Sequence, residues 1–204
     1  MTSFDERAQQ WDQNPMRRER ADAVAQAIRQ HMPNRKDLRA LEYGCGTGLL
    51  SFALQDDFAH ITLADNAKGM LQELERKIHQ AGIRHFSPLL LDLLSQPPPA
   101  ESFHVIYTLM TLHHILDLHS ILGAFHHLLL PDGFLFIADL DEEDGSFHGS
   151  GFQGHLGFDR SVLARHVQEA GFRDITFQTV YVIKRQTEDG EKAYPVFLMT
   201  ARRK

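Results

Sequence analysis

The sequence predicts an α/β fold: a doubly wound, seven-stranded, mostly parallel sheet with an N-terminal helical cap and a C-terminal antiparallel hairpin. Short apolar segments alternate with helical patterns over about the first 140 residues, which is typical of βαβ units with helices on both faces of a sheet. A glycine-rich turn at 44–48 follows the first apolar segment. Near the C-terminus, Asp189-Gly190 separates two long strand candidates, and this dipeptide favours the tight turn of a hairpin.

Strands and helices are expected in a regular order. The expected strands are 37–43, 59–65, 85–92, 103–110, 134–140, 175–185 and 193–202. The expected helices are 47–55, 67–80, 117–130 and 159–171, with one or two more over 1–34. Gly82 is well placed to end the helix 67–80, and the Pro-Asp-Gly turn at 131–133 is expected to end the helix 117–130. Pro15 occupies a favoured first-turn position, and Pro88 weakens the prediction for the first half of the third strand.

Composition excludes several classes of protein. The chain has 204 residues, is 43% hydrophobic and carries a formal net charge of −6, so it lacks the clustered Lys and Arg that nucleic acids and anionic membranes select. Its single cysteine, Cys45, cannot form an internal disulfide, which fits a reducing compartment. The charged N-terminus is unlike a secretory signal, and no apolar run approaches the ~18 residues of a membrane span. We expect a cytoplasmic monomer or homodimer with neither nucleic-acid nor membrane partners.

Three glycines, Gly44, Gly46 and Gly48, indicate a ligand. A glycine-rich turn between a strand and a helix exposes backbone N–H groups and lets a ligand approach the main chain. The spacing is G-x-G-x-G, and Leu49 stands where the dinucleotide fingerprint G-x-G-x-x-G has its third glycine. Asp65 ends the next strand, and a carboxylate at that position can accept both hydroxyls of a ribose. The turn therefore predicts a nucleoside ligand that is not a dinucleotide.

Several segments together resemble class I S-adenosylmethionine-dependent methyltransferases. They are LEYGCGTG (41–48), LADNAKGML (63–71), LLLDLL (89–94), FHVIYTLMTLHHI (103–115) and LLLPDGFLFIAD (128–139). These segments follow the order and spacing of the family over nearly the whole chain, and FDERAQQWDQNPMRRERA resembles the helical cap of small bacterial members. The absence of an Asn-Pro-Pro-Tyr segment argues against methylation of DNA bases or of glutamine. The resemblance implies a single domain, 1–204, divided into a helical cap (1–34), a cofactor-binding half (35–140), and a lid loop, helix and hairpin (141–204).

The resemblance implies S-adenosylmethionine as cofactor and S-adenosylhomocysteine as product. The cofactor-binding residues that it implies are Glu42, Gly44, Gly46, Gly48, Asp65, Asn66, Met70, Asp92, Leu93 and Thr108, the last of which would border the methionine moiety. Glu42 would orient the methionine end, directly or through water, and Asp65 would hold the ribose. Met70 would pack on the adenine, Asp92 would receive its amino group, and Leu93 would offer a backbone N–H.

Histidines are expected around the methyl acceptor. His113 and His114 follow the fourth strand, while His148 and His155 lie in the glycine-rich loop at 145–157, which is as pliable as a lid. Loops after parallel strands meet above the carboxyl ends of the strands, so we expect His113, His148 and His155 at the acceptor site. Histidine suits proton transfer near neutral pH, and we expect His148 or His155 to support acceptor binding or deprotonation. The alternative for His113 and His114 is that each only caps or packs the following helix.

Two other interpretations concern the same loop. Phe147, Phe152 and Phe158 would either line an apolar acceptor pocket or clamp the loop onto its own domain. A metal site that joins the histidines to DLDEED (139–144) is not favoured, because no metal-binding spacing supports it. The DLDEED segment is instead interpreted as a solvated acidic loop, and no metal is expected.

The resulting functional prediction is methyl transfer to a small molecule by in-line displacement. The enzyme would hold the nucleophile, the methyl carbon and the sulfur collinear in a site that excludes water. One alternative is a non-catalytic S-adenosylmethionine-binding protein. Another is a nicotinamide-dependent oxidoreductase, against which the glycine spacing and the closing hairpin argue. The sequence leaves the acceptor and its nucleophilic atom open.

Overall fold

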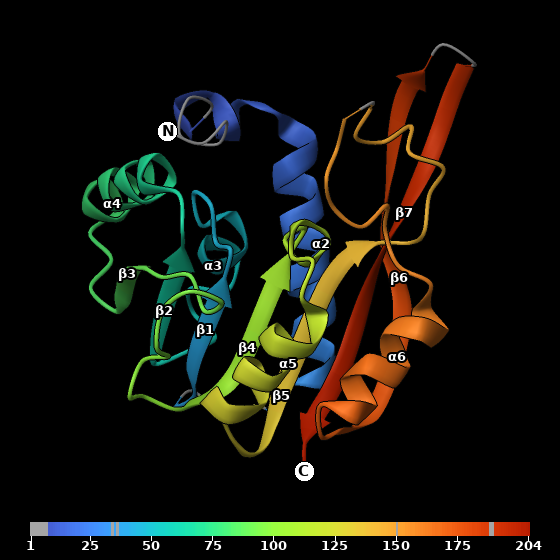
Figure 1. Cartoon of the computed structure of the whole chain (residues 1–204). Helices are drawn as coiled ribbons and strands as arrows, with labels where there is room; N and C mark the ends of the chain where they lie inside the picture. Colours follow the sequence, from blue (N-terminus) through green and yellow to red (C-terminus); the bar gives the residue numbers. More distant parts are fainter. Residues whose placement is uncertain (1–7, 34, 36, 150, 188–189) are drawn as a thin grey trace.

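The strands form one seven-stranded sheet, in the order β3-β2-β1-β4-β5-β7-β6, in the computed structural model, which describes residues 8–33, 35, 37–149, 151–187 and 190–204 (Figure 1). The strands are β1 (Arg39–Tyr43), β2 (His60–Asp65), β3 (Phe86–Leu90), β4 (Phe103–Leu109), β5 (Leu129–Leu140), β6 (Phe172–Thr187) and β7 (Gly190–Arg203). β1 to β5 run parallel, and β7 lies antiparallel between β5 and β6. The predicted fold class is confirmed.

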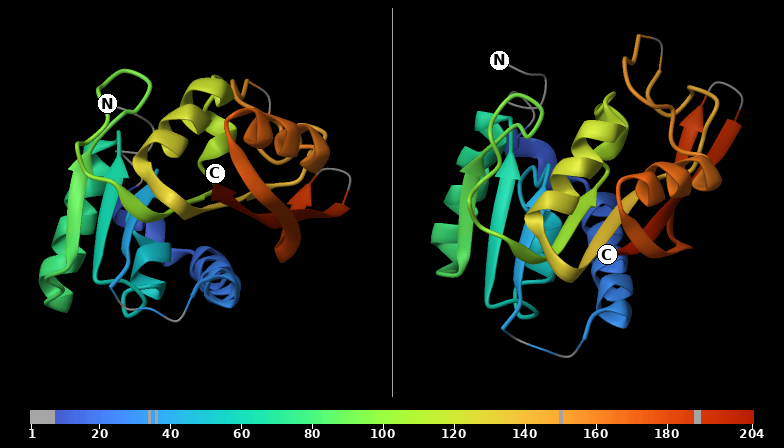
Figure 2. Two further views of the ribbon diagram at one scale, coloured as in Figure 1. Left: turned by 90° about the horizontal axis from the view of Figure 1, so that it is seen from below. Right: turned by 60° about the horizontal axis from the view of Figure 1, so that its bottom comes forward.

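Helices cover both faces of the sheet (Figure 2). They are the 3₁₀ segments η1 (Ala8–Gln13) and η2 (Leu112–His114), with α2 (Pro15–His31), α3 (Leu49–Ala53), α4 (Lys68–Ala81), α5 (Leu118–Leu128) and α6 (Arg160–Glu169). One apolar cluster joins α2, α3 and α4 to one face, and a second joins α5 and α6 to the opposite face. Within the described ranges, no helix has both the length and the apolar character needed to cross a membrane.

The N-terminal cap consists of η1 and α2 in the described residues, and positions 1–7 and 34 of the predicted cap lie outside them. The side chain of Asn14 accepts a hydrogen bond from the N–H of Met16 at 3.0 Å and so caps α2, whose first residue is Pro15. Gly82, with φ +66°, ends α4 as the sequence predicts. Local sequence signals therefore set these helix ends.

Three predicted helices are shorter than expected, and two of them have a structural cause. The helix predicted over 47–55 is the five-residue α3, because Gly48, with φ +80°, is its N-cap. The helix predicted over 117–130 ends two residues early, and the Pro-Asp-Gly turn that was expected to end it lies inside β5. Leu129 has an extended backbone and pairs with Phe103 of β4, which draws the chain into the sheet before the turn.

The two edges of the sheet account for two sequence features. β3 is an edge strand, where Pro88 lies opposite Leu63, and an edge strand tolerates the missing N–H of a proline. At the other edge, β6 pairs with β7 as far as Thr187 and Gly190. These two residues flank the predicted hairpin turn, of which Asp189 lies outside the described residues.

The glycine turn provides a first prediction. A Cβ on Gly48 would lie 2.7 Å from Cδ1 of Leu74 and 3.2 Å from Cδ2 of Leu63, whereas a Cβ on Gly82 has nothing within 4 Å among the described atoms. Both residues have a left-handed backbone, which costs about 1–2 kcal/mol for an L residue. Gly82→Ala should therefore lose about that amount of unfolding free energy. Gly48→Ala should lose about 1–3 kcal/mol more through overpacking.

Urea unfolding of the two variants beside the wild type measures this difference. The Gly82→Ala variant is the control, because it carries the same backbone strain without the collision. Equal losses in the two variants would mean that the contact with Leu74 is not what requires a glycine at position 48.

Candidate active site

The carboxyl ends of β1, β2, β4 and β5 lie at the same end of the sheet, the upper end in Figure 1, where η1 also lies. β2 and β4 flank β1, so the chain passes from β1 to one side of the sheet and later returns to the other side. Doubly wound sheets bind ligands at the carboxyl ends of the strands where this change of direction occurs. The glycine turn follows β1, Asp65 ends β2, Asp92 follows β3 and His113 follows β4. The structure therefore brings the predicted cofactor and acceptor residues to the same end of the sheet.

The three glycines of the turn are needed for different reasons. All three have positive φ, between +53° and +80°. A Cβ on Gly44 would lie 2.1 Å from Cγ2 of Thr111, and one on Gly48 would collide with a leucine of α4. A Cβ on Gly46 would meet only Sδ of Met70, at 4.0 Å, in the part of the chain that the structure describes. Gly44 and Gly48 thus make room for side chains of the protein, whereas Gly46 faces open space.

The N–H groups of the turn are bonded within the protein. Those of Gly44 and Cys45 donate to the carbonyl of Ala64 at 2.8 and 3.0 Å, and that of Gly46 donates to Oδ2 of Asp65 at 2.7 Å. The expectation that the turn exposes its N–H groups to a ligand is therefore wrong for these three residues. Oδ1 of Asp65 accepts in addition from the N–H of Ala67 at 2.8 Å, so backbone N–H groups hold both oxygens of this carboxylate in place. A carboxylate oxygen can accept more than one hydrogen bond.

Glu42 is buried at the end of β1, directly behind the turn. Its Oε2 accepts hydrogen bonds from the N–H of Ser51, at 3.2 Å, and from the Ser51 hydroxyl, which lies 2.7 Å from the hydroxyl of Tyr107. Burial raises the pKa of Glu42 to about 8, although the hydrogen bonds from Ser51 act in the opposite direction. A protonated Glu42 therefore links β1 to α3 at neutral pH.

The cap covers the side chain that was predicted to contact adenine. Met70 is buried, and Trp11 of η1 packs against its cluster. Asp12 accepts hydrogen bonds from the hydroxyl of Thr47 and from Nζ of Lys77, each at 2.5 Å, and Lys77 also donates to the carbonyl of Thr47 at 2.8 Å. One carboxylate thus connects η1, the glycine turn and α4. Sequence reasoning missed Asp12 and Lys77, because no local pattern relates them.

Four other predicted cofactor residues have different surroundings. Oδ1 of Asp92 accepts a hydrogen bond at 3.0 Å from the N–H two residues further on, within the turn after β3. The N–H of Leu93 donates to the phenol oxygen of Tyr43 at 3.2 Å, so it already has a partner. Asn66 is exposed. Thr108 is buried, and its hydroxyl has no hydrogen-bond partner among the described residues.

His113 and Asp139 form a buried pair at the ends of η2 and β5. Nδ1 of His113 lies 2.6 Å from Oδ1 of Asp139, and the two side chains are 3% and 0% exposed. Asp139 also accepts from the N–H groups of His113 and Leu140, at 3.2 and 2.8 Å. Burial alone would raise the pKa of Asp139, but His113 and these N–H groups hold it below its ordinary value. An ionised carboxylate can only accept, so Nδ1 of His113 is the donor to Asp139, and Nε2 is the ring nitrogen left for other partners.

The segment between β4 and η2 joins this pair to the glycine turn. The hydroxyl of Thr111 lies 3.2 Å from the carbonyl of Gly44, to which it donates, and its methyl group fills the space where a Cβ of Gly44 would be. Met110 has φ +55°, a left-handed backbone that is rare for a residue other than glycine, and its N–H donates to the carbonyl of Ala138 at 2.8 Å. Such backbone outliers concentrate at functional sites, which fits a site at the end of β4.

The glycine-rich loop after β5 packs on the His113–Asp139 pair. The ring centroid of His148 lies 4.8 Å from that of His113, and His148 stacks on Phe152 at 3.8 Å. Burial and the neighbouring His113 lower the pKa of His148, so its ring is neutral at neutral pH. Nδ1 of His148 is 3.7 Å from Oε1 of Glu143, and neither atom has a hydrogen-bond partner among the described residues.

The third predicted histidine has a backbone partner. The ring Nε2 of His155 lies 3.0 Å from the carbonyl of Ile115, and the N–H of His155 donates to the carbonyl of the buried histidine at 2.8 Å. Of the three loop phenylalanines, Phe147 and Phe158 are buried in the main apolar clusters and clamp the loop to its own domain. Phe152 contacts the rings of both His113 and His148, and Phe147 also contacts that of His148.

The interpretation of residues 139–144 as a solvated acidic loop is wrong at two positions. Asp139 is fully buried, and the side chain of Glu143 is only 6% exposed. Oε2 of Glu143 accepts from the N–H groups of Gly145 and Phe147, at 2.8 and 3.0 Å, so this carboxylate organises the loop from inside. The sequence did contain a signal that Asp139 belongs to the site. Asp139 comes near the end of the fifth predicted strand, much as Asp65 comes at the end of the second. Among the described residues, no group of three or more His, Cys, Asp or Glu side chains is arranged to hold a metal ion.

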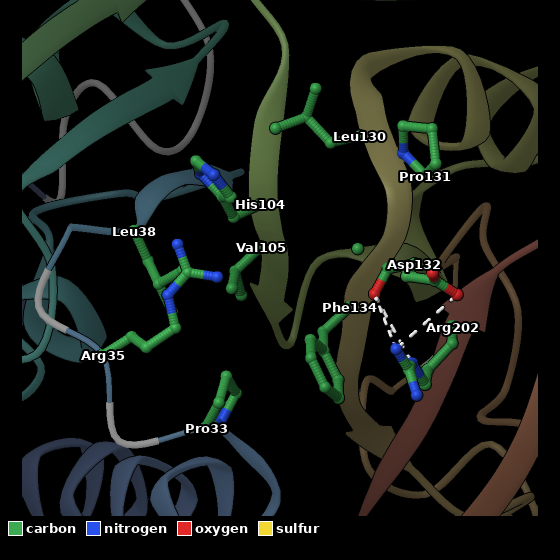
Figure 3. Close-up of a pocket in the computed structure, with 11 residues that line it drawn as sticks. Pro33, Arg35, Leu38, His104, Val105, Leu130, Pro131, Asp132, Phe134 and Arg202 are labelled. Atoms are coloured by element: carbon green, nitrogen blue, oxygen red, sulfur yellow. Dashed lines mark hydrogen bonds and ion pairs between the residues drawn. The ribbon is translucent and has the colours of Figure 1, made fainter.

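A separate cavity of about 200 Å³ lies at the opposite end of the sheet (Figure 3). Val105 and Phe134, neighbours near the amino end of β4, line it together with Leu38, which precedes β1. Arg202 reaches its rim and lies 3.6 Å from the carboxylate of Asp132. This cavity is therefore not part of the candidate site at the carboxyl ends.

Comparison with known proteins agrees with this geometry. Residues 16–177 match a family model described as a methyltransferase domain. A ubiquinone biosynthesis O-methyltransferase of Xylella fastidiosa is 33% identical over 111 residues, which are 53% of this chain and 44% of that protein. Phosphoethanolamine N-methyltransferase 1 of Arabidopsis thaliana is 28% identical over 172 residues, 78% of this chain and 35% of that protein. The chain thus spans less than half the length of either relative.

A solved structure has the same fold. The N-methyltransferase NodS of Bradyrhizobium japonicum superposes with a TM-score of 0.70 and 19% identity, over 94% of this chain and 98% of that one. The sheet order, the glycine turn after β1 and the acid at the end of β2 define the class I S-adenosylmethionine-dependent methyltransferase fold. With the family match over most of its length, the chain belongs to the methyltransferase domain family, and the resemblance found in the sequence is confirmed.

The buried Glu42 provides a second prediction. Its pKa rises from the ordinary 4.5 in the unfolded chain to about 8 in the folded protein, so folding opposes its ionisation. The stability that it contributes is fully present below pH 4.5 and is lost as the pH rises through 8. Between pH 5 and pH 8.5 the wild type should therefore lose on the order of 4 kcal/mol of unfolding free energy from this group, because each pKa unit corresponds to about 1.4 kcal/mol.

Urea unfolding at pH 5 and pH 8.5 measures this loss, with Glu42→Gln as the matched variant. Glutamine keeps the shape of the neutral acid and does not ionise, so the variant should lose less stability between the two pH values. The difference between the two proteins isolates position 42 from all other titrating groups. Identical pH dependence in both would contradict the raised pKa.

Proposed function

We propose that this protein transfers the methyl group of S-adenosylmethionine to a small-molecule acceptor. The observation that carries the proposal is the open space at Gly46, between the ribose acid Asp65 and the adenine contact Met70. Membership of the methyltransferase domain family supports it. The relatives compared above are named for O- and N-methyl transfer, so they leave the acceptor atom of this chain open.

The cofactor-binding residues keep the roles inferred from the sequence. Asp65 binds the ribose with the acceptor capacity that its two backbone donors leave, and Met70 contacts the adenine beneath the cap. Asp92 receives the adenine amino group, and Leu93 contributes its N–H by exchanging the phenol of Tyr43 for the adenine ring. The remaining members of the proposed set are Glu42 and Thr108 toward the methionine, Asn66 beside the ribose, and Gly44 and Gly48 in the turn.

His113 is the proposed general base. S-adenosylmethionine supplies a methyl group on a positively charged sulfur, which becomes the neutral thioether of S-adenosylhomocysteine. As the acceptor atom forms its bond to the methyl carbon and the carbon–sulfur bond breaks, the acceptor loses its proton. His113 takes this proton on Nε2, because Asp139 keeps Nδ1 protonated. The Asp139 carboxylate then stabilises the positive charge on the ring.

The two loop histidines have supporting roles in this proposal. His148, stacked on Phe152 beside His113, forms a wall of the acceptor site and excludes water from it. His155 supports acceptor binding through the loop, because its ring and its N–H both bond to backbone carbonyls next to the site.

Cofactor binding provides the third prediction. S-adenosylhomocysteine at about 100 times its Kd should add ~2.7 kcal/mol of stability. For a domain of this size, that addition should raise Tm by roughly 5–10 °C in a thermal-shift measurement. Asp65→Ala should abolish the shift, whereas the exposed Asp56→Ala, a control with the same loss of charge, should retain it. A shift with NAD and none with S-adenosylhomocysteine would contradict the proposal.

Catalysis provides the fourth prediction. His113→Gln should lower kcat by about 10²–10⁴, because it removes base catalysis, while the affinity for S-adenosylhomocysteine stays the same. Asp139→Asn should lower kcat as well, because it removes the charge that stabilises the protonated ring. The exposed His119→Gln is the control and should keep full activity. The assay is release of S-adenosylhomocysteine with the first acceptor found in a small-molecule library. Full turnover of His113→Gln at saturating acceptor would exclude His113 as the base.

A further inference from the structure

Arg20 is a partly buried cation at the acceptor side of the site. It lies in α2 next to Ala21, which is buried in the core beneath the sheet. Its Nε is buried and has no hydrogen-bond partner among the described residues. Burial, with the neighbouring charge of Arg17, lowers the pKa of Arg20 to about 10, so the guanidinium is still charged at neutral pH. A buried, charged N–H donor without an acceptor is a group that a ligand can satisfy.

Arg185 on β6 is a second cation, and its charge contributes to the lowered pKa of Arg20. Its guanidinium donates to the carbonyl of Phe147 at 2.6 Å and lies 3.8 Å over the ring of the same residue. Burial lowers the pKa of Arg185 as well. Within the described part of the chain, no ion pair joins either arginine to a carboxylate at 4.0 Å or less, and the printed partner of Arg185 is the neutral Phe147.

The nearby carboxylates, in contrast, have donors. Asp139 accepts from the ring and the N–H of His113 and from the N–H of Leu140. Oε2 of Glu143 accepts from two N–H groups of its own loop. Oε1 of Glu143 has no hydrogen-bond partner among the described residues and lies 3.7 Å from Nδ1 of His148. A hydroxyl or an amine of a bound molecule can donate a hydrogen bond to this oxygen. The carboxylates of this region thus have hydrogen-bond donors from the protein, whereas Nε of Arg20 has no acceptor among the described residues.

These groups belong to one site. Glu19, next to Arg20 in α2, accepts a hydrogen bond from the hydroxyl of Tyr181 of β6 at 3.1 Å. Tyr181 lies opposite Val196 of β7, which lies opposite Leu140, the residue after Asp139. His148 contacts His113, the proposed base. In the sheet, β4 separates β1 from β5, so Asp139 at the end of β5 lies on the side of the site away from β2 and the ribose acid. The part of α2 that holds Arg20 thus packs on the β5 side of the site and not on the ribose side.

We propose that the methyl acceptor carries a carboxylate or phosphate group and that Arg20, with Arg185 beside it, binds this anion. A guanidinium pairs with either group through two parallel hydrogen bonds, which also fixes the orientation of the bound molecule. The hydroxyl or amine to be methylated then lies toward Glu143, His148 and His113. This inference rests on the proposed methyl-transfer function, since it names the substrate class of that same site.

Isothermal titration with simple anions tests the inference. The probes are benzoate, phenyl phosphate and the neutral benzamide, at constant ionic strength, with and without saturating S-adenosylhomocysteine. The wild type should bind benzoate or phenyl phosphate and bind benzamide at least about tenfold more weakly. The tighter of the two anions identifies the group as a carboxylate or a phosphate.

Variants assign the binding to Arg20. Arg20→Gln should weaken the preferred anion at least about tenfold, whereas Arg18→Gln, an exposed position on the same helix with the same loss of charge, should bind it as the wild type does. Arg20→Lys, which keeps the charge but not the paired donors, should lie between them. The affinity for S-adenosylhomocysteine should change less than about twofold in all three.

Several results would overturn the inference. They are equal binding of benzamide and benzoate, unchanged anion binding in Arg20→Gln, and a loss of S-adenosylhomocysteine affinity in Arg20→Gln without loss of anion binding, which would make Arg20 a cofactor contact. Failure of the proposed function is distinguishable. A wild type that binds the anions but not S-adenosylhomocysteine would refute methyl transfer and leave the anion site in place.

Discussion

The carboxylate of Asp139 is the constraint on which the candidate site depends. A charge with no exposure to water is tolerated only when hydrogen bonds replace its hydration, and Asp139 receives them from the ring and the N–H of His113 and the N–H of Leu140. These bonds hold η2 against the end of β5. Thr111, directly before η2, in turn contacts Gly44, so the position of the glycine turn is tied to the same buried charge.

Much of the fold was predictable because its signals are local. Hydrophobic periodicity identified every strand and the main helices, and Gly82 ended its helix where the pattern predicts. The end of α5 was predicted wrongly because pairing with a distant strand decides it. α5 ends before Leu129 because Leu129 pairs with Phe103, and the residues around Leu129 do not predict that partner.

The site was predicted only in part, for a related reason. Gly46 and Asp65 were found because a short motif relates them, and His113 because it follows a strand that ends at the site. Asp139 and Glu143 were interpreted as surface acids, since charged side chains are rarely buried, and only the structure shows the donors that permit their burial. Arg20 is likewise a charged residue on a helix, and its residue type alone predicts that it is exposed to solvent.

The contact between Gly44 and Thr111 has a consequence for protein engineering. The two positions are 67 residues apart in sequence, yet the side chain of one occupies the volume that any side chain at the other would need. The residues at these two positions therefore have to be substituted together. A chimera that takes the segment after β4 from another member of the family, in order to acquire its acceptor, has to keep a residue compatible with the recipient's glycine turn at position 111 or import that turn as well.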